Sequence, residues 1–214
     1  PNPPGTYLAL AGADIVCNLS ASDELIGKHA YLKSLLAQQS ARTMAGYVYS
    51  GCGFGESTQD VVYGGNALIY ENGKLLAQNK RFDFEPQIVV SEIDIFKLRA
   101  ERRTNSTYVN AQHGHTALLH TAQAPLTNKP FALQRTIEPL PFVPQDEQMH
   151  DSCEEIFNIQ VSGLAQRLKH IHASKVVLGI SGGLDSTLAL LVCVRTFDKL
   201  GLSREGIIGV TMPG

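Results

Sequence analysis

The first hundred residues alternate between short apolar runs of strand length and one longer run with helical spacing. Apolar residues predict strands over residues 13–19 and 47–49, and the spacing of apolar side chains over residues 31–43 predicts a helix between them. Two further strands are predicted over residues 67–70 and 75–77. The dipeptide Asn-Gly lies between these last two runs and strongly favours a tight hairpin turn.

The pattern changes twice before residue 150. A fifth strand is predicted over residues 87–93, and a charged helix follows it to about Arg103. We interpret the charges of this helix as a solvated face on which Lys97 pairs with Glu101. Over residues 104–150 the periodicity fades and five prolines accumulate. We therefore expect an interdomain connector that wraps over a surface.

Helical spacing returns after residue 151. Ser152 and Glu155 fit a capping box, in which each side chain accepts a hydrogen bond from a free backbone N–H group. One apolar face of this helix is predicted from the spacing of Phe157, Val161, Leu164, Leu168 and Ile171. A strand over residues 175–180, a helix to about Leu200 and a strand over residues 207–211 follow. Such a crossover implies parallel strands with a ligand site at their carboxyl ends.

The loop between the strand over residues 175–180 and the helix to about Leu200 has the composition of a phosphate site. Glycines let an anion approach the backbone, and the free N–H groups and the positive dipole end of a helix start attract negative charge. It is not a Walker A loop, because no lysine occurs between Lys175 and Lys199. The residues of the candidate site are Gly179, Ile180, Ser181, Gly182, Gly183, Leu184, Asp185 and Ser186.

Asp185 suggests which ligand this loop binds. A carboxylate repels a polyphosphate unless a divalent cation lies between them, so we expect Asp185 to be a Mg²⁺ ligand and the bound molecule to be a nucleotide polyphosphate. The alternative is a simple tight turn in which Asp185 only interacts with the helix dipole. The hydroxyls of Ser181 and Ser186 on either side of the acid favour the phosphate site.

Bulk composition narrows the class of protein. With 43% hydrophobic and 18% charged residues, the 214-residue chain has ordinary globular composition. Its net charge of −2 does not indicate a basic surface that would bind nucleic acid. No apolar run approaches the roughly 18 residues of a membrane span, and no signal peptide is recognised. We therefore expect a cytoplasmic protein without nucleic-acid or membrane partners.

The cysteines and histidines indicate neither a metal centre nor a nucleophile. Cys52 lies among glycines, but no histidine or lysine near it in sequence would help it form a thiolate. His113 and His115 lie in a polar segment with no third ligand nearby, so we interpret them as solvated. Reduced, buried thiols are expected for the four widely spaced cysteines, Cys17, Cys52, Cys153 and Cys193.

The motif Ser-Gly-Gly-x-Asp-Ser, here residues 181–186, resembles the pyrophosphate loop of the ATP-pyrophosphatase enzymes, which adenylate a carbonyl or carboxylate oxygen. GMP, asparagine, argininosuccinate and NAD synthetases and tRNA-thiolating enzymes share this loop. The flanking residues 157–164, 175–187 and 210–214 are similar to the synthetase domain of the glutamine-dependent NAD synthetases. This resemblance implies a C–N ligase that uses ATP, Mg²⁺, glutamine and deamido-NAD.

Residues 1–103 resemble the C-terminal half of a nitrilase-type amidase domain, the glutaminase of these synthetases. The similar segments are residues 18–22, 26–28, 47–49, 55–58 and 66–73. By this resemblance Ser22 and Lys28 contact glutamine, where some members carry arginine in place of the lysine. The catalytic Cys, Glu and Lys are expected upstream of Pro1, so no catalytic residue is expected in this chain. The alternative for Ser22 and Lys28 is a surface loop and a helix start.

The resemblance implies an α/β fold in three parts. Residues 1–103 correspond to the C-terminal half of a nitrilase-type α-β-β-α sandwich, residues 104–150 to the connector, and residues 151–214 to the start of a Rossmann-like parallel-sheet ATP-pyrophosphatase domain. Because the chain begins at Pro1 with no methionine and stops as a strand ends, we expect an internal fragment. By the resemblance we expect the enzyme to be a homo-oligomer. Two other hypotheses stay open: an inactive nucleotide-binding fragment, or another amidotransferase such as GMP or asparagine synthetase.

Overall fold

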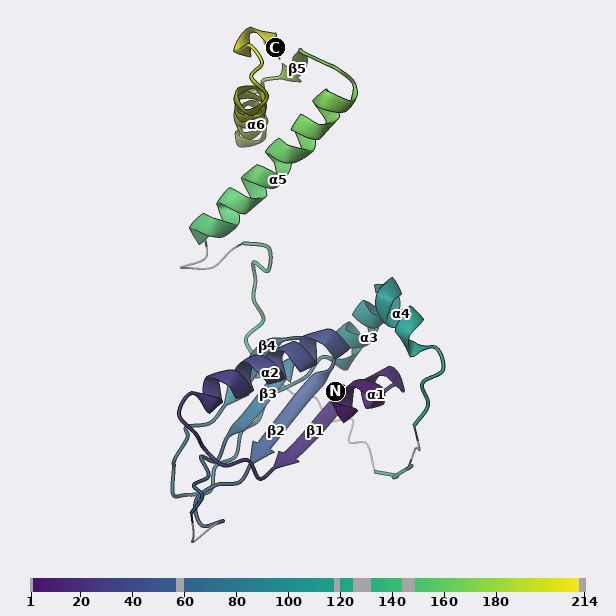
Figure 1. Cartoon of the computed structure of the whole chain (residues 1–214), viewed down its shortest axis with the longest axis vertical. Coiled ribbons are helices and arrows are strands. Elements are labelled where there is room, and N and C mark those ends of the chain that lie inside the picture. The colour runs from purple at the N-terminus through teal and green to yellow at the C-terminus, as the bar shows by residue number, and fades with distance from the viewer. Residues whose placement is uncertain (1, 57–59, 118–119, 125–131, 144–148, 212–214) are drawn as a thin grey trace. The chain divides into compact units, whose positions relative to one another are not determined.

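The computed structural model describes residues 2–56, 60–117, 120–124, 132–143 and 149–211. The chain divides into two compact units, Pro1–Ile137 and Glu138–Gly214, each with its own sheet (Figure 1). Residues 57–58 and 212–214 belong to segments that carry the resemblance above, and they lie outside the described residues.

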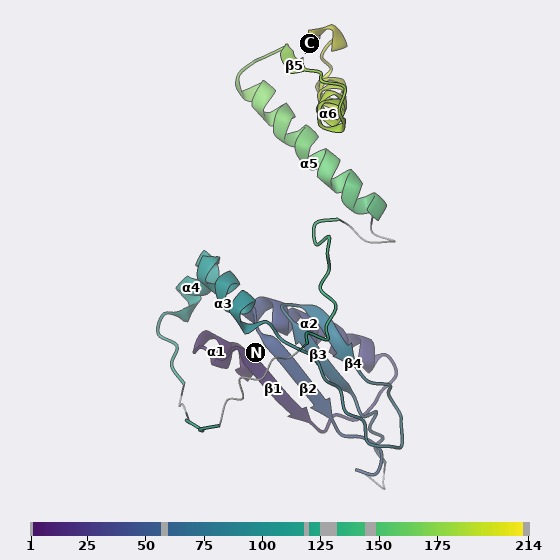
Figure 2. The ribbon, with the colours of Figure 1, turned by 180° about the vertical axis from the view of Figure 1, so that it is seen from behind.

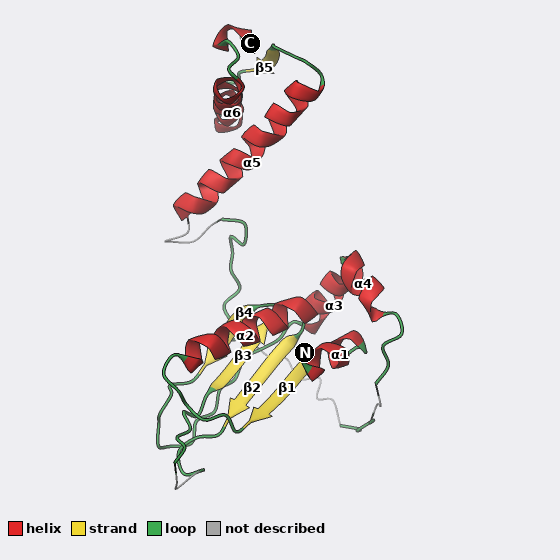
Figure 3. Cartoon of the chain, in the orientation of Figure 1, coloured by secondary structure: helices red, strands yellow, loops and turns green. Residues whose placement is uncertain are grey.

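A four-stranded sheet forms the centre of the first unit. The strands lie in the order β1 (Ile15–Ser20), β2 (Gly46–Gly51), β3 (Ala67–Glu71) and β4 (Lys74–Gln78). β1 is parallel to β2, and the other neighbours are antiparallel. Helix α2 (Lys28–Thr43) lies across one face of the sheet, and the strands lie in front of it when the molecule is seen from behind (Figures 2 and 3). The predicted helix and four strands are thus confirmed.

The hairpin between β3 and β4 turns where the sequence predicts it. Asn72 and Gly73 have φ values of 45° and 85°, so both central residues lie in the left-handed region that a type I′ turn requires. A Cβ added to Gly73 would lie 3.0 Å from the Cβ of Ala41 in α2. The glycine therefore serves both the turn geometry and the close approach of the turn to the helix.

The core of the first unit combines α2 with alternate residues of three strands. Leu36 of α2 is 2% exposed and packs on large strand side chains. The strand register pairs Val16 with Tyr47 and Tyr47 with Tyr70, so these side chains lie side by side on one face. Tyr49 extends the same cluster, since it lies two residues after Tyr47. This packing fixes α2 on the sheet.

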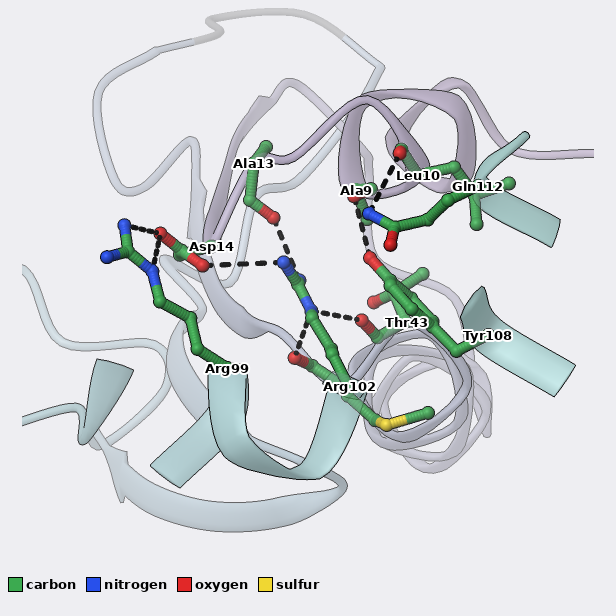
Figure 4. Close-up of polar contacts among 10 residues, drawn as sticks. Ala9, Leu10, Ala13, Asp14, Thr43, Arg99, Arg102, Tyr108 and Gln112 are labelled. Carbon is green, nitrogen blue, oxygen red and sulfur yellow. Dashed lines mark hydrogen bonds and ion pairs between the residues drawn. The ribbon is translucent and has the colours of Figure 1, made fainter. Parts of the chain in front are cut away.

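Arg102 corrects the prediction of a solvated helix face before residue 103. It lies in α3 (Ile95–Thr104), is 6% exposed, and contacts three main-chain carbonyl groups (Figure 4). Its Nε donates to Thr43 O at 3.2 Å and to Met44 O at 3.0 Å, and its Nη2 donates to Ala13 O at 2.8 Å. Asp14 adds an ion pair to Arg102 at 3.4 Å and one to the neighbouring Arg99 at 2.6 Å. Arg99 and Arg102 therefore bind other segments of the first unit and do not form a solvated face.

The expected partner of Lys97 is also engaged elsewhere. Glu101 accepts a hydrogen bond from Asn72 Nδ2 at 2.5 Å in the β3–β4 turn. Among the described residues, no ion pair joins Lys97 to Glu101. The intrahelical pairing inferred from the four-residue spacing is therefore wrong, and Glu101 instead contacts a turn 29 positions earlier in the chain.

Part of the segment expected to be a connector packs on the first unit. It contains α4 (Ser106–Gln112), whose Tyr108 hydroxyl donates to Ala9 O at 2.7 Å in α1 (Pro4–Leu10) (Figure 4). Gln112 Nε2 donates to Leu10 O at 3.3 Å. Periodicity did not predict this short helix, because only Tyr108 of its seven residues is buried.

The strand predicted over residues 87–93 is wrong. These residues have no regular secondary structure. Ile88 and Val90 are 91% and 75% exposed, so the apolar run of this segment meets no sheet edge among the described residues. A strand requires a hydrogen-bonded neighbour, and in this structure β4 ends the sheet.

A partly buried ion pair joins β3 to residue 135. Arg135 Nη1 lies 2.7 Å from Glu71 Oε2, and Arg135 also donates to the Glu92 carbonyl at 2.9 Å. Burial by itself raises the pKa of Glu71, but the hydrogen bonds from Arg135 and from the Asp94 amide, with the charges of Arg135 and Lys97, lower it below its ordinary value. The stabilisation that this carboxylate provides is therefore present above its unfolded pKa and is lost as pH falls through its folded pKa.

We expect Arg135→Met to lower the free energy of unfolding by about 2 kcal/mol at neutral pH, because it leaves the buried Glu71 carboxylate without its counter-ion and with the Asp94 amide as a donor. The difference from the wild type should shrink as Glu71 is protonated below about pH 4. Urea unfolding at pH 3.5 and pH 7 measures both values. Arg99→Met is the control, because its side chain is 56% exposed and its ion pair should contribute at most about 1 kcal/mol. Equal losses at both pH values would contradict the role of Glu71.

The second unit is a helix followed by a strand, helix, strand crossover. Its elements are α5 (Met149–His170), β5 (Val176–Gly179), α6 (Leu184–Leu200), the short 3-10 helix η2 (Arg204–Gly206) and β6 (Ile207–Val210). β5 and β6 are parallel, which confirms the prediction from the two apolar runs. The mixed α/β class of the chain is also confirmed.

Helices α5 and α6 pack through small and apolar side chains. Val161 of α5 and Phe197 of α6 are fully buried. Thr196 is also fully buried, and its Oγ1 lies 2.7 Å from Val192 O and 3.3 Å from Val161 O, so its polar atom is satisfied. Two of the five residues predicted for the apolar face, Val161 and Leu168, are buried, whereas Ile171 follows the helix and is 63% exposed.

The predicted capping box at Ser152 is wrong. α5 begins at Met149, so Ser152 lies inside the helix and does not precede it. A serine followed three residues later by glutamate marks a helix start only when the chain before it leaves the helical conformation. Here Met149, His150 and Asp151 continue the helix by almost one more turn.

Candidate functional site

The loop between β5 and α6 presents backbone rather than side chains at its tip. Gly182 has a φ of +81°, and a Cβ added to it would meet nothing within 4 Å. Gly183 is the N-cap of α6, and the nearest atom to an added Cβ there is Ser181 Oγ at 3.5 Å. Ile180 continues the strand pairing through its N–H, which donates to Val210 O at 2.8 Å. The loop therefore follows directly from the end of the parallel pair.

Serine and threonine hydroxyls hold the loop in this conformation. Ser181 Oγ lies 3.2 Å from Ser186 Oγ and accepts from the Gly183 N–H at 3.4 Å. Ser186 Oγ donates to Gly183 O at 3.0 Å, and Thr187 Oγ1 donates to the same oxygen at 2.9 Å. The predicted loop residues thus come together in one hydrogen-bonded turn. Thr187 is an addition, and its position one residue beyond the motif was the only signal for it.

The start of α6 is suited to an anion with a divalent cation. The N–H groups of Leu184, Asp185 and Ser186 have no intrahelical acceptor, because they lie in the first turn. Asp185 is exposed beside them. Asp185 is the acidic residue in the first turn of α6, and no group of three or more potential metal ligands occurs among the described residues. Mg²⁺ suits that arrangement, since it binds one or two carboxylates together with phosphate oxygens and water.

Ser22 and Lys28 lie together at a second candidate site in the first unit. Both line a cavity of about 680 Å³ beside β1 and α2. The loop from β1 to α2 positions them, with Gly27 in the left-handed region at a φ of +81° just before the helix begins at Lys28. The ammonium group of Lys28 lies 2.9 Å from the Asp23 carboxylate. Asp23 was not anticipated, although its place five residues before Lys28 was visible in the sequence.

The cysteines are free, as expected, but not all are buried. Cys17 and Cys153 are exposed, Cys52 is half-buried, and only Cys193 is buried. Burial raises the pKa of the Cys193 thiol, which makes it a poor nucleophile. An apolar run does not bury all its residues, because successive strand side chains such as Val16 and Cys17 face opposite sides of the sheet.

The two histidines expected to be solvated differ in the structure. His113 is exposed. His115 is half-buried, and its ring centroid lies 5.8 Å from that of Tyr7. His115 therefore contributes to packing against α1.

No helix in the described part of the chain is long and apolar enough to cross a membrane.

The second unit combines a parallel strand pair with a glycine loop at the start of a helix, an α/β arrangement in which the first-turn amides are open to an anion. Sequence comparison shows which proteins the chain is similar to. Residues 156–214 match the NAD synthase family model. Over 222 aligned residues the chain is 41% identical to the glutamine-dependent NAD(+) synthetase of Mycobacterium leprae, covering 100% of this chain and 32% of that protein. The corresponding protein of Thermotoga maritima is 25% identical, with 100% of this chain and 34% of that protein covered.

The resemblance to the glutamine-dependent NAD(+) synthetase family that the motifs indicated is thus confirmed along the whole chain. The chain spans about a third of the length of these curated relatives. The homologous stretch includes both candidate sites, because it extends from the first residue to the last.

Solved structures give weaker matches. The glutamine-dependent NAD+ synthetase of Acinetobacter baumannii in complex with ADP covers 98% of this chain and 30% of its own, at 19% identity and a TM-score of 0.38. A carbon-nitrogen hydrolase of Helicobacter pylori covers 51% of this chain and 41% of its own, at 16% identity and a TM-score of 0.42. Scores this low do not define a shared architecture, so the sandwich expected for residues 1–103 stays a prediction.

Proposed function

We propose that this chain is part of an enzyme that makes NAD from deamido-NAD, ATP and glutamine. The 41% identity to glutamine-dependent NAD(+) synthetases over the whole chain is the observation that carries the proposal. In the proposed reaction the nicotinate carboxylate of deamido-NAD attacks the α-phosphate of ATP and pyrophosphate leaves. Ammonia from glutamine then attacks the acyl-adenylate, and AMP leaves with one carboxylate oxygen.

The loop of residues 179–186 is proposed to bind the pyrophosphate. The first-turn amides of α6 donate to its oxygens, and their fixed position stabilises the charge that develops as the bond to the α-phosphate breaks. Asp185 is proposed to hold Mg²⁺, which supplies Lewis-acid neutralisation of the same charge. Ser181 and Ser186 keep the turn in shape through their mutual contact at 3.2 Å.

The cavity beside β1 and α2 is proposed to bind glutamine. Lys28 offers a positive charge for the α-carboxylate, and Ser22 offers a hydroxyl on the same wall. In this assignment residues 1–103 belong to the glutaminase part and residues 151–214 to the synthetase part, with the residues between them as the connection. Hydrolysis in one part then supplies the nitrogen that the other part uses.

A second function stays open because other amidotransferases share the loop motif. The discriminating experiment offers the complete gene product ATP, Mg²⁺ and glutamine with deamido-NAD, xanthylate or aspartate as the acceptor. The proposal predicts AMP formation and amidation with deamido-NAD alone. Amidation of xanthylate or aspartate instead would assign the protein to the GMP or asparagine synthetases. No turnover with any acceptor would favour the inactive nucleotide-binding hypothesis.

We expect Gly182→Val to reduce kcat/KM for ATP by about 100-fold, which corresponds to about 2.7 kcal/mol. A β-branched residue is an outlier at a φ of +81°, so the loop must leave the conformation that exposes its amides. Steady-state kinetics with varied ATP measures the effect. Gly163→Ala is the control, because this glycine lies within α5 with nothing within 4 Å of an added Cβ. Equal ATP kinetics in the wild type and Gly182→Val would show that the loop is not part of the ATP site.

A further inference from the structure

The loop from β1 to α2 brings two opposite charges to the wall of the cavity. Asp23 and Lys28 both line it, next to Ser22. Lys28 Nζ donates to Asp23 Oδ1 at 2.9 Å and to the Asp23 main-chain oxygen at 2.6 Å. The hydrogen bond and charge of Lys28 lower the pKa of Asp23, so the carboxylate is ionised at neutral pH. A fixed pair of unlike charges therefore faces the proposed glutamine site.

Lys28 has a hydrogen-bond donor, and Asp23 an acceptor oxygen, that the ion pair between them does not use. A lysine ammonium has three donors, and Asp23 occupies two of those of Lys28. Lys28 binds Oδ1 of the Asp23 side chain and not Oδ2. The two side chains are 30% and 43% exposed. One positive donor and one negative acceptor thus lie side by side and remain open to a ligand.

Glu24 fixes the position of the pair. Its side chain is 9% exposed, its Oε1 accepts from Asn66 Nδ2 at 2.6 Å, and its Oε2 lies 2.7 Å from Arg81 Nη2. The N–H of Glu24 donates to Val62 O at 2.7 Å. A Cβ on Gly64 would collide with the Glu24 carboxylate, so the glycine leaves the space that these contacts need. Asp23 is held next to an anchored residue rather than on a free loop.

We propose that Asp23 is a specificity-determining residue that binds the α-ammonium of glutamine while Lys28 binds its α-carboxylate. This inference rests on the proposed glutaminase function of the first unit. The two charged groups of an α-amino acid are attached to the same carbon and lie about as close together as the two side chains of a salt bridge. When glutamine lies antiparallel to the Asp23–Lys28 pair, its α-ammonium faces the Asp23 carboxylate and its α-carboxylate faces the Lys28 ammonium. The ammonium donates to Oδ2 of Asp23, and the carboxylate accepts the third N–H of Lys28.

The pair therefore recognises a zwitterion and not simply an amide or an anion. An acyl amide without an α-ammonium would offer no donor to Oδ2 of Asp23, whose cationic partner would then be Lys28. Lys28 alone would attract any carboxylate. Asp23 accordingly provides the discrimination between glutamine and its deaminated analogue, 5-amino-5-oxopentanoate.

The test uses Asp23→Asn in the complete gene product, with Asp83→Asn as the matched control. Asp83 is exposed, does not line the cavity, and carries the same acid-to-amide change. NAD formation is measured with glutamine, with ammonia in its place, and with 5-amino-5-oxopentanoate as a competitive inhibitor of glutamine use. We expect Asp23→Asn to lower kcat/KM for glutamine by about 10- to 100-fold, the loss expected for one charge-assisted hydrogen bond.

The inhibition constant of 5-amino-5-oxopentanoate should change by less than about threefold, because this molecule makes no contact that requires the Asp23 charge. Synthesis with ammonia should proceed as in the wild type, which shows that the variant is folded. Parallel weakening of glutamine and the analogue would overturn the proposal, since Asp23 would then act only by positioning Lys28. Unchanged glutamine kinetics would overturn it as well. A wild type that makes no NAD even with ammonia would refute the proposed function itself.

Discussion

Asp185→Asn is expected to reduce the rate of ATP-dependent NAD formation by about 1,000-fold, because one neutral amide replaces the single carboxylate that would hold Mg²⁺ against the leaving pyrophosphate. The side chain is exposed in the first turn of α6, so the fold of the second unit should be unaffected. The rate of pyrophosphate release at increasing Mg²⁺ concentration measures the effect. A weakened metal site predicts that the residual rate requires more Mg²⁺ than in the wild type.

Asp198→Asn provides the control on the same helix. Asp198 lies in the last turns of α6 and pairs with Arg204 at 2.8 Å, away from the loop. Its substitution makes the same chemical change without touching the candidate metal position. If Asp185→Asn and Asp198→Asn showed the same Mg²⁺ dependence as the wild type, the metal role of Asp185 would be wrong.

Phe197→Ala is expected to lower the free energy of unfolding of the second unit by about 3 to 5 kcal/mol, the usual cost of removing a fully buried aromatic ring. Phe197 lies in α6, and its side chain is 0% exposed. It also lies close to the chain at residue 206, where a Cβ added to Gly206 would approach the phenyl ring to 2.8 Å. The cavity left by alanine therefore loosens both α6 and the segment that leads into β6.

Urea unfolding of the 214-residue chain measures this loss. Phe142→Ala is the matched control, because Phe142 lies in the same unit and is 94% exposed. We expect the control to change the free energy of unfolding by less than about 0.5 kcal/mol. Similar losses for the two phenylalanines would mean that α6 does not form the core described above.

The local structure around the candidate site in the second unit could be predicted almost completely from sequence. The strand, the glycine loop and the helix follow one another within residues 175–200, so local patterns contain the information that positions them. Gly182, Gly183 and Asp185 lie where the motif places them. The conformation of the loop was predictable for the same reason, because Ser181 and Ser186 are five residues apart.

The polar contacts of the first unit could not be predicted in this way. Arg102 reaches Ala13 across 89 positions, and Glu24 reaches Arg81 across 57. A charged residue on a helix has the same local pattern whether it is solvated or paired with a distant carbonyl group. Only the tertiary arrangement decides between the two. The strand predicted over residues 87–93 failed for the same reason, since strand formation depends on a neighbour that the local sequence does not specify.

The most direct test of the proposed chemistry follows one oxygen atom. Deamido-NAD labelled with ¹⁸O in its nicotinate carboxylate is incubated with the complete gene product, ATP, Mg²⁺ and glutamine, and the products are analysed by mass spectrometry. Adenylation with a pyrophosphate-binding loop predicts NAD, unlabelled pyrophosphate, and AMP that carries ¹⁸O. Formation of ADP with ¹⁸O in inorganic phosphate would contradict the account, because the carboxylate would then have attacked the γ-phosphate and no pyrophosphate would leave.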